Sequence, residues 1–331
     1  MSLLLGITLS VLFGVIPMTL YALLLAWFDR YEKEPPLLML GVFLWGLIVA
    51  AGAALIVNTV FGVSLFLVTG SEDLATLGAA VVSAPLVEET VKGLAVLGVF
   101  LFFRHEFDSL LDGVIYGSLV GFGFAAAENI NYIFTGFLEA GVEGLIVLVF
   151  IRAVLIAFLH ATLTAFTGIG FAVARLNRGC LPALGPILGY GAAVGAHAFH
   201  NLLASVGNPL VCLLGSVIDW IGFFGMFAFV LFLVWREGQI MREHLREEVD
   251  RGLITGRQFE AACSVSGQMA ARWGALAGGG WRQASRFYDL CGELAFKKYQ
   301  LARLGPQQER GAQAAIDRLR GQIAGLRQGV G

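Results

Sequence analysis

Acidic, basic, imidazole and amide side chains interrupt several long apolar stretches of this sequence. An ionised group at the middle of a bilayer costs roughly 2.5–3.5 kcal/mol on insertion scales, so such residues must pair with one another or face water. Together they predict a polar site, or a paired network, inside a membrane. The residues are Glu88, Glu89, Lys92, Glu128, Asn129, Asn131, Arg152, His160, His197, His200 and Asn201.

Helical spacing places several of these side chains on common faces. Glu88 and Lys92 are four positions apart, and Glu89 precedes Lys92 by three, so the lysine can pair with either carboxylate. His197 and Asn201 are likewise four positions apart. At about 1.5 Å of rise per residue, the polar positions of different stretches fall within roughly 14 Å of depth. We therefore expect them to meet in the outer half of the bilayer.

The residue types suit hydrolysis. A carboxylate in a pocket of low dielectric is a competent general base for water. Neutral imidazole and asparagine N–H groups can polarise a carbonyl and hold an oxyanion. The sequence contains no HExxH, GxGD or GxSG motif of the kinds used by other intramembrane proteases. A protease built on this sequence would therefore use Glu and His.

Composition identifies the elements that must position these residues. Hydrophobic residues make up 57% of the chain and charged residues only 14%, with a mean hydropathy of +0.78. Soluble domains contain about 25% charged residues, so the composition indicates a membrane protein. A span needs about 20 apolar residues. Seven stretches satisfy this requirement: 3–28, 37–61, 77–103, 109–134, 145–176, 183–205 and 209–235.

The predicted fold class is all-α, a polytopic transmembrane helix bundle of about seven to eight spans with a helical soluble C-terminal tail. The eighth span depends on the long stretch 145–176, which must tilt, protrude or break near Arg152. We place the transmembrane domain at residues 1–235 and the cytoplasmic tail at 236–331. In the tail, helices are expected at 240–250, 258–272 and 284–304 and after Pro306, in a regulatory or packing role.

The distribution of Lys and Arg predicts the orientation. The loops 29–36, 104–108 and 177–182 carry Lys or Arg, whereas the alternate loops 62–76, 135–144 and 206–208 carry none. Because cytoplasmic loops are enriched in these residues, the N-terminus is predicted outside and the C-terminus in the cytoplasm. The expected location is a plasma membrane of the bacterial type. No nucleic-acid-binding motif is present, and the oligomeric state is not predicted.

Several motifs occur in a fixed order along the chain. They are Asp29-Arg-Tyr-Glu-Lys-Glu-Pro35, EExxK at 88–92, FxxxE at 124–128, Arg152 with His160, and HxxxN at 197–201. In this order the sequence resembles the PrsW family of intramembrane proteases, which belongs to a superfamily with the type II CAAX prenyl endopeptidases and the Abi proteins. The resemblance covers most of residues 15–235. EExxK and FxxxE replace the EExxxR and FxxxH of the CAAX branch, which favours the PrsW branch over processing of prenylated proteins.

The resemblance implies cleavage of a membrane-associated protein, such as an anti-sigma factor or a similar regulator. It assigns catalytic roles to three pairs of residues. Glu88 and Glu89 form the carboxylate pair, and Glu128 and His160 complete the water site. His197 and Asn201 form an oxyanion or orienting pair. Lys92 and Arg152 are interpreted as charge partners, and His200 and Asn129 as residues that support the site from behind. Asp219 faces lipid, a lumen or a partner, and the sequence does not decide between them.

The sequence leaves metal dependence open. The family has been described both as metalloproteases and as glutamic proteases. A divalent metal such as zinc would have Glu89, Glu128, His160 and His197 as candidate ligands. Their spacing matches no metal motif, so no cofactor is favoured and glutamate-activated water is the preferred interpretation.

Two other classes of function are compatible with buried acids and imidazoles. A proton-coupled transporter or channel also uses such groups as proton relays. The sequence shows no duplicated halves with matching interrupted helices, which is the usual layout of a transporter. A non-catalytic membrane scaffold of the same fold is the other alternative, and the presence of every motif argues against it.

Overall fold

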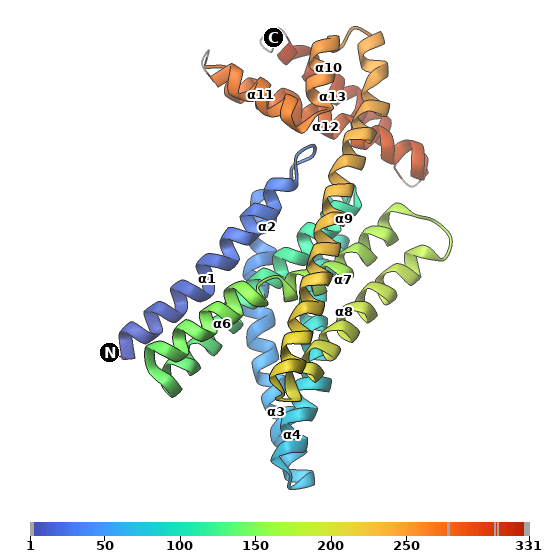
Figure 1. Cartoon of the computed structure of the whole chain (residues 1–331). Helices are drawn as coiled ribbons and strands as arrows, with labels where there is room; N and C mark the ends of the chain where they lie inside the picture. Colours follow the sequence, from blue (N-terminus) through green and yellow to red (C-terminus); the bar gives the residue numbers. More distant parts are fainter. Residues whose placement is uncertain (1–2, 277–278, 308, 310, 328–331) are drawn as a thin grey trace. The chain divides into compact units, whose positions relative to one another are not determined.

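A computed structural model describes residues 3–276, 279–307, 309 and 311–327, and every element within these residues is a helix (Figure 1). The predicted all-α class is confirmed. The chain divides into two compact units. The first contains the residues up to Trp27, Pro35–Arg175 and Gly179–Phe229, and the second contains Phe28–Glu34, Leu176–Arg178 and the chain from Val230 onward.

Long helices joined by short irregular segments form the first unit. The helices are α1 (Leu3–Phe28), α2 (Pro36–Leu44), α3 (Ala51–Thr69), α4 (Glu72–Gly78), α5 (Ala84–Phe102), α6 (Leu110–Phe150), α7 (Leu159–Leu176), α8 (Leu181–Ser205) and the first part of α9 (Pro209–Asp250). Three π-helical segments lie among them: η1 (Trp45–Ala50), η2 (Ala79–Ser83) and η4 (Ile151–Leu155). A 3₁₀ turn, η3 (Arg104–Glu106), follows α5.

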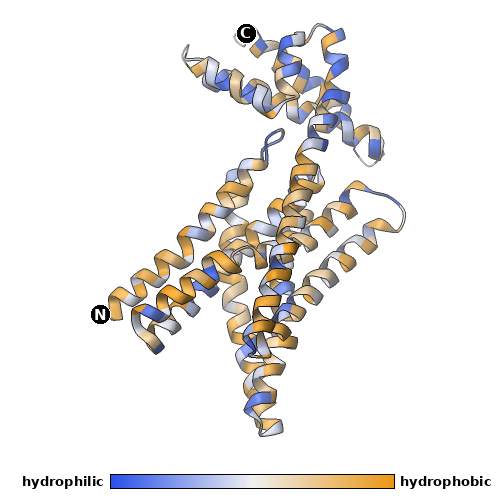
Figure 2. Ribbon diagram, in the orientation of Figure 1, coloured by the Kyte–Doolittle hydropathy of each residue, from blue (hydrophilic) through white to orange (hydrophobic). Residues whose placement is uncertain are grey.

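Four stretches of the described residues are long and apolar enough to cross a membrane: Leu3–Phe28, Pro36–Thr69, Leu110–Leu176 and Pro209–Asp250. Their ribbons are mostly orange in Figure 2, whereas the C-terminal helices mix orange with blue. The predicted spans 77–103 and 183–205 are also helical. The first of them carries Glu88, Glu89 and Lys92, which lowers its hydropathy. The predicted number of seven to eight spans stays a prediction.

The stretch from Leu110 to Leu176 is not one straight rod. It reverses direction where Ala140 and Gly141 leave helical geometry, and Gly141 has a φ of 64°, a conformation that glycine adopts at little cost. After η4, residues 156–158 interrupt the helix before α7 begins. Of the three alternatives for this stretch (tilting, protruding or breaking near Arg152), the break is present. Arg152 itself lies in the π-helical turn, a type of distortion that is frequent at functional sites.

Glycines on α6 let neighbouring helices approach at backbone distance. A Cβ at Gly121 would overlap the carbonyl of His160 on α7, and a Cβ at Gly123 would overlap the carbonyl of Phe43 on α2. Small residues at such crossings are typical of membrane helix packing. The α6–α7 contact at Gly121 places the backbone of His160 directly against α6.

The second unit contains the end of α9 with α10 (Gly256–Ala262), α11 (Val265–Leu276), α12 (Trp281–Leu304) and α13 (Ala312–Leu326). The expected single helix at 258–272 was wrong, because the chain turns at Cys263 and Ser264, and the Ser264 hydroxyl accepts a hydrogen bond from the Gly267 N–H. The predicted domain boundary after residue 235 falls inside the continuous helix α9, and the compact units separate at Phe229.

Two short segments from the N-terminal part of the chain, Phe28–Glu34 and Leu176–Arg178, belong to this second unit. Tyr31 is buried in its apolar core, and the backbone of Tyr31 packs directly on Gly292 of α12. Lys33 pairs with Asp289 at 3.1 Å. The Arg303 guanidinium donates to the carbonyl of Leu176 at 2.7 Å. The helix α12 thus binds both the 28–34 loop and the 176–178 segment.

Candidate active site

Glu88 and Glu89 are adjacent on α5 but lie in different environments. The Glu88 Oε1 accepts a hydrogen bond from Asn58 Nδ2 on α3 at 3.3 Å. Its Oε2 is buried and has no hydrogen-bond partner among the described residues. Glu89 is fully enclosed, with no exposed side-chain surface. Successive helical residues point about 100° apart, which gives the two carboxylates different surroundings.

Glu89 is the centre of a closed network. Lys92 donates to its Oε1, His197 Nδ1 lies 2.9 Å from the same oxygen, and Thr164 Oγ1 donates to Oε2 at 3.1 Å. The Lys92 ammonium also lies 3.3 Å from His160 Nδ1 and over the ring of Phe124. In the structure Lys92 pairs with a carboxylate of EExxK, and the partner is Glu89.

Glu128 belongs to a second network, which His160 links to the first through its other ring nitrogen. Arg152 and His160 Nε2 both contact its Oε2, the latter at 2.8 Å. The Arg152 Nε donates to Asn129 Oδ1 at 2.9 Å, and the guanidinium lies over the Tyr132 ring at 4.4 Å. Arg152 is thus a charge partner of Glu128, and the Asn129 side chain helps to fix the position of the Arg152 guanidinium.

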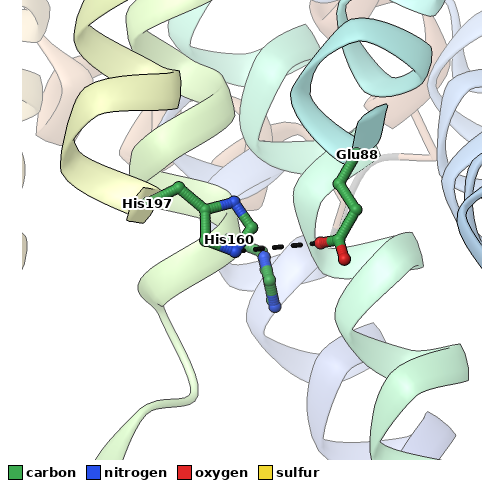
Figure 3. Close-up of side chains that lie close together, drawn as sticks. All are labelled: Glu88, His160 and His197. Carbon is green, nitrogen blue, oxygen red and sulfur yellow. Dashed lines mark ion pairs between the residues drawn. The ribbon is translucent and has the colours of Figure 1, made fainter. Parts of the chain in front are cut away.

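The contacts of His197 determine its tautomer. The Glu89 carboxylate is ionised because it forms an ion pair with the Lys92 ammonium. An ionised carboxylate can only accept a hydrogen bond, so His197 Nδ1 is the donor in their contact. The proton then sits on Nδ1, and the lone pair sits on Nε2. This lone pair faces the unpartnered Glu88 Oε2 at 3.8 Å, the contact drawn as a dashed line in Figure 3.

A cavity of about 910 Å³ lies against these residues, within the range typical of ligand sites. Its lining includes most of the polar residues singled out in the sequence: Glu88, Glu128, Arg152, His160, His197, His200 and Asn201. Glu89 and Lys92 are not part of the lining and lie behind it. The seven lining residues converge on this cavity from α5, α6, η4, α7 and α8.

Asn201 and His200 lie on the α8 wall of the cavity. Asn201 Nδ2 donates to the carbonyl of Ala80 at 2.8 Å, in the π-helical segment that precedes α5. His200 Nδ1 lies 2.8 Å from Asp219 Oδ2 on α9. Asp219, which the sequence left unplaced, therefore has a partner in the protein.

Among the described residues, one group could hold a metal ion: Glu88, His160 and His197, each of which offers a donor atom within 4.8 Å of the others. They converge in Figure 3. This group contains Glu88 and neither Glu89 nor Glu128, which the sequence had placed among the candidate ligands. Both carboxylate oxygens of Glu89 and the Oε2 of Glu128 already have hydrogen-bond partners. Glu88 Oε2 has none among the described residues.

Sequence reasoning missed three contributors. Asn58 binds Glu88, Thr164 binds Glu89 and Tyr132 stacks on Arg152. Two signals were available: Asn58 is a polar residue inside an apolar stretch, and Thr164 lies four positions after His160 on the same helix face. Tyr132 carries no such signal, because aromatic residues are common in membrane helices.

Residues 34–235 match the family described as PrsW family intramembrane metalloprotease. The chain belongs to the PrsW family. All the residues that converge on the cavity lie inside the matched segment, and α10 to α13 lie outside it. Membership confirms the resemblance seen in the sequence and, with the apolar helices, identifies an integral membrane protein.

Curated PrsW proteins match parts of the chain. Protease PrsW of Geobacillus kaustophilus (strain HTA426) is 34% identical over 147 residues, which cover 44% of this chain and 58% of that protein. Protease PrsW of Clostridioides difficile (strain 630) is 35% identical over 107 residues, covering 32% and 43%, and that of Bacillus subtilis (strain 168) is 27% identical over 149 residues, covering 45% and 61%. The chain thus spans about half the length of these relatives. No solved structure matches the chain.

Proposed function

We propose that this PrsW-family chain is an intramembrane endopeptidase that hydrolyses a peptide bond of a membrane-associated protein in the cavity. The observation that supports this best is the pairing of two electron-rich atoms, His197 Nε2 and Glu88 Oε2, at the wall of the cavity. Two lone pairs that face each other in a buried site repel unless a proton or a cation lies between them. A site built in this way suits the activation of water.

The donor set fits a divalent metal such as zinc. Glu88, His160 and His197 would hold it, and the orphaned Glu88 Oε2 would gain a partner. Three protein ligands with an open position are typical of catalytic zinc sites. Such an ion would supply Lewis acidity, polarising a carbonyl and lowering the pKa of water. Both ring nitrogens of His160 already have partners, so His160 would exchange one of these contacts on binding.

The residues around these three have separate roles in the proposal. Glu89, neutralised by Lys92, fixes the His197 tautomer, an arrangement in which a carboxylate orients a ligating histidine. Glu128 also lines the cavity, and both of its contacts fall on Oε2. Its Oε1 would accept the proton of the attacking water, which makes Glu128 the general base.

Asn201 is the proposed donor to the scissile carbonyl. One of its two amide hydrogens is donated to Ala80, and the other is available at the cavity wall. A donor aimed at a developing oxyanion accelerates acyl transfer by about 10²–10³-fold. His197 presents a lone pair to the cavity, so it suits the role of ligand better than that of oxyanion donor.

The proposed substrate is a membrane protein whose scissile bond reaches the cavity from the outer side, with the N-terminus of the chain outside and its C-terminus in the cytoplasm. The absence of Lys and Arg from the loops 62–76, 135–144 and 206–208 supports this orientation. Two residues that line the cavity belong to this side: Glu72 lies within the loop 62–76, and Ser205 directly precedes the loop 206–208. An anti-sigma factor or a similar regulator is the substrate class implied by the family.

Cleavage is tested with purified protein in proteoliposomes and membrane proteins drawn from the same cells. We expect new N-termini with the wild-type protein, and loss of cleavage by Glu89→Gln and His197→Ala. Glu143→Gln, which changes an exposed carboxylate outside the cavity, is the matched control and is expected to remain active. Undiminished cleavage by both site variants would refute the proposal. Ion flux that depends on the same carboxylates, without cleavage, would favour a transporter.

A further inference from the structure

His200 and Asp219 form a pair that the proposed chemistry does not use. His200 lies on α8, Asp219 lies on α9, and their Nδ1 and Oδ2 atoms are 2.8 Å apart. Their side chains are only 15% and 12% exposed. Desolvating two ionisable groups inside an apolar bundle is costly, so such a pair is expected to have a role in the protein.

The orientation of the His200 ring follows from the walls of the cavity. His200 lines the cavity, whereas no residue of α9 is among its described lining residues. The Nδ1 edge points to Asp219 on α9, so the part of the ring at the cavity is the opposite edge, which carries Nε2. An ionised Asp219 accepts the Nδ1–H, and the lone pair is left on Nε2.

The α8 wall offers few other acceptors. Asn201 and Ser205 are its other polar residues at the cavity besides His197, and the Ser205 hydroxyl already donates to the Asn201 carbonyl. The adjoining wall, from α4 to the start of α5, contributes four alanines besides Glu72 and Thr76: Ala75, Ala79, Ala80 and Ala84. A peptide that enters such a cavity must satisfy each of its buried main-chain N–H groups, since an unpaired one is costly.

We propose that His200, oriented by Asp219, binds the substrate main chain by accepting a backbone N–H on Nε2 next to the scissile bond. His200 is then a substrate-binding residue, and Asp219 is a positioning residue that acts through it. This inference rests on the proposed function, because it assigns a substrate contact to the same cavity. It leaves the metal-binding residues and the general base unchanged.

The test uses the full chain in detergent and quenched fluorescent casein, a general protease substrate. His200→Ala and Asp219→Ala are each expected to raise KM about 5–10-fold, the equivalent of one lost hydrogen bond, with kcat within about two-fold of wild type. The double variant is expected to be no worse than His200→Ala alone, because Asp219 acts only through His200. Zinc content is expected to be unchanged in all three.

A matched control separates substrate binding from helix packing. Tyr190 on α8 shares a 2.7 Å hydrogen bond with Thr90 on α5 and does not line the cavity. Tyr190→Phe therefore removes a comparable contact of α8 and is expected to leave KM unchanged. Asp219→Asn, which preserves the shape of the side chain, replaces Asp219→Ala if the latter does not fold.

The outcomes separate this inference from the proposed function. Casein cleavage by the wild type with unchanged KM in His200→Ala overturns the inference alone. Additive losses in the double variant, or an equal loss in Tyr190→Phe, also overturn it, because they indicate packing. Binding of labelled casein is measured in parallel on Glu128→Gln. A wild type that cleaves neither casein nor the membrane proteins in proteoliposomes, together with a Glu128→Gln protein that binds no casein, contradicts both proposals.

Discussion

At the scale of single residues, the two glutamates of EExxK have different tasks. Glu88 faces the cavity with one oxygen unpartnered among the described residues, whereas Glu89 is enclosed by Lys92, His197 and Thr164. The sequence predicted both carboxylates and their pairing with lysine. It could not tell which one faces the cavity, because that depends on how α5 is rotated against α7 and α8.

Glu88→Gln and Glu89→Gln should therefore differ in metal affinity. We expect Glu88→Gln to abolish stoichiometric zinc binding, since it removes a proposed ligand. Glu89→Gln removes only the partner that orients His197, so affinity should fall by about 10–100-fold. Competition with a chromogenic chelator measures both values. Equal affinities in the two variants and in the wild type would exclude Glu88 as a ligand.

The His200–Asp219 pair and the Asn58–Glu88 contact show the limit of inference at this scale. Each residue is visible in the sequence as a polar group in an apolar stretch. His200 and Asp219 are 19 positions apart, and Asn58 and Glu88 are 30 positions apart, with the two members of each pair on different helices. Periodicity relates residues on one helix only, so such contacts require the packed structure.

At the scale of helices, the apolar stretches were predictable from length and composition, and a break near Arg152 was one of three alternatives for the stretch 145–176. The π-helical segments were not predictable. η2 and η4 lie next to the site, and the Ala80 carbonyl of η2 is satisfied by Asn201 from another helix. A distortion stabilised by a distant side chain leaves no local pattern in the sequence.

Gly121 is the position where helix packing controls the site most directly. Gly121→Ala would force α6 away from the His160 backbone, which we expect to cost about 1–3 kcal/mol of stability and to weaken metal binding. Thermal unfolding and zinc affinity in detergent measure the two effects. The control is Gly41→Ala on α2, whose added Cβ meets no atom within 4 Å. Equal behaviour of the two variants would show that the α6–α7 contact does not position His160.

At the scale of the whole molecule, the C-terminal helices were predictable as helices but not in their contacts. They lie outside the family match, and their core takes in Tyr31, which belongs to the Asp29–Pro35 motif near the other end of the chain. Contacts between residues more than 200 positions apart, such as Tyr31 with Cys263, have no signature in a single sequence.

The packing of Tyr31 on Gly292 should govern how the 28–34 loop is held. Gly292→Ala would place a methyl group against the Tyr31 carbonyl, so we expect the loop to be released and Lys33 to become more sensitive to trypsin. Gly274→Ala on α11, where an added Cβ meets no atom within 4 Å, is the control. Unchanged digestion at Lys33 in Gly292→Ala would contradict the contact.

Acid should loosen the second unit. Hydrogen bonds from Lys298 and Arg251 lower the pKa of Glu247 to about 2. Burial raises the pKa of Glu248, but hydrogen bonds from Arg320 and Lys298 outweigh it, and the pKa is lowered overall. Because both folded-state pKa values lie below the unfolded value of about 4.3, their stabilisation is complete above that pH and is lost as the pH falls toward 2.

Hydrogen exchange of α12 and α13 amides, followed from about pH 6 down to about pH 3, measures this loss after correction for the intrinsic rate. Glu248→Gln should be less protected at neutral pH and should depend less on pH. A wild type whose corrected protection does not fall with pH would show that these carboxylates do not stabilise the unit.

The most direct test of the account is a comparison of N-terminal peptides from membranes of cells that contain the wild-type protein or Glu88→Gln. Hydrolysis in the cavity predicts at least one new N-terminus, inside or beside a membrane segment, that is present with the wild type and absent with Glu88→Gln. Identical peptide sets, with both proteins present at equal levels, would contradict a hydrolytic role for the residues around this cavity.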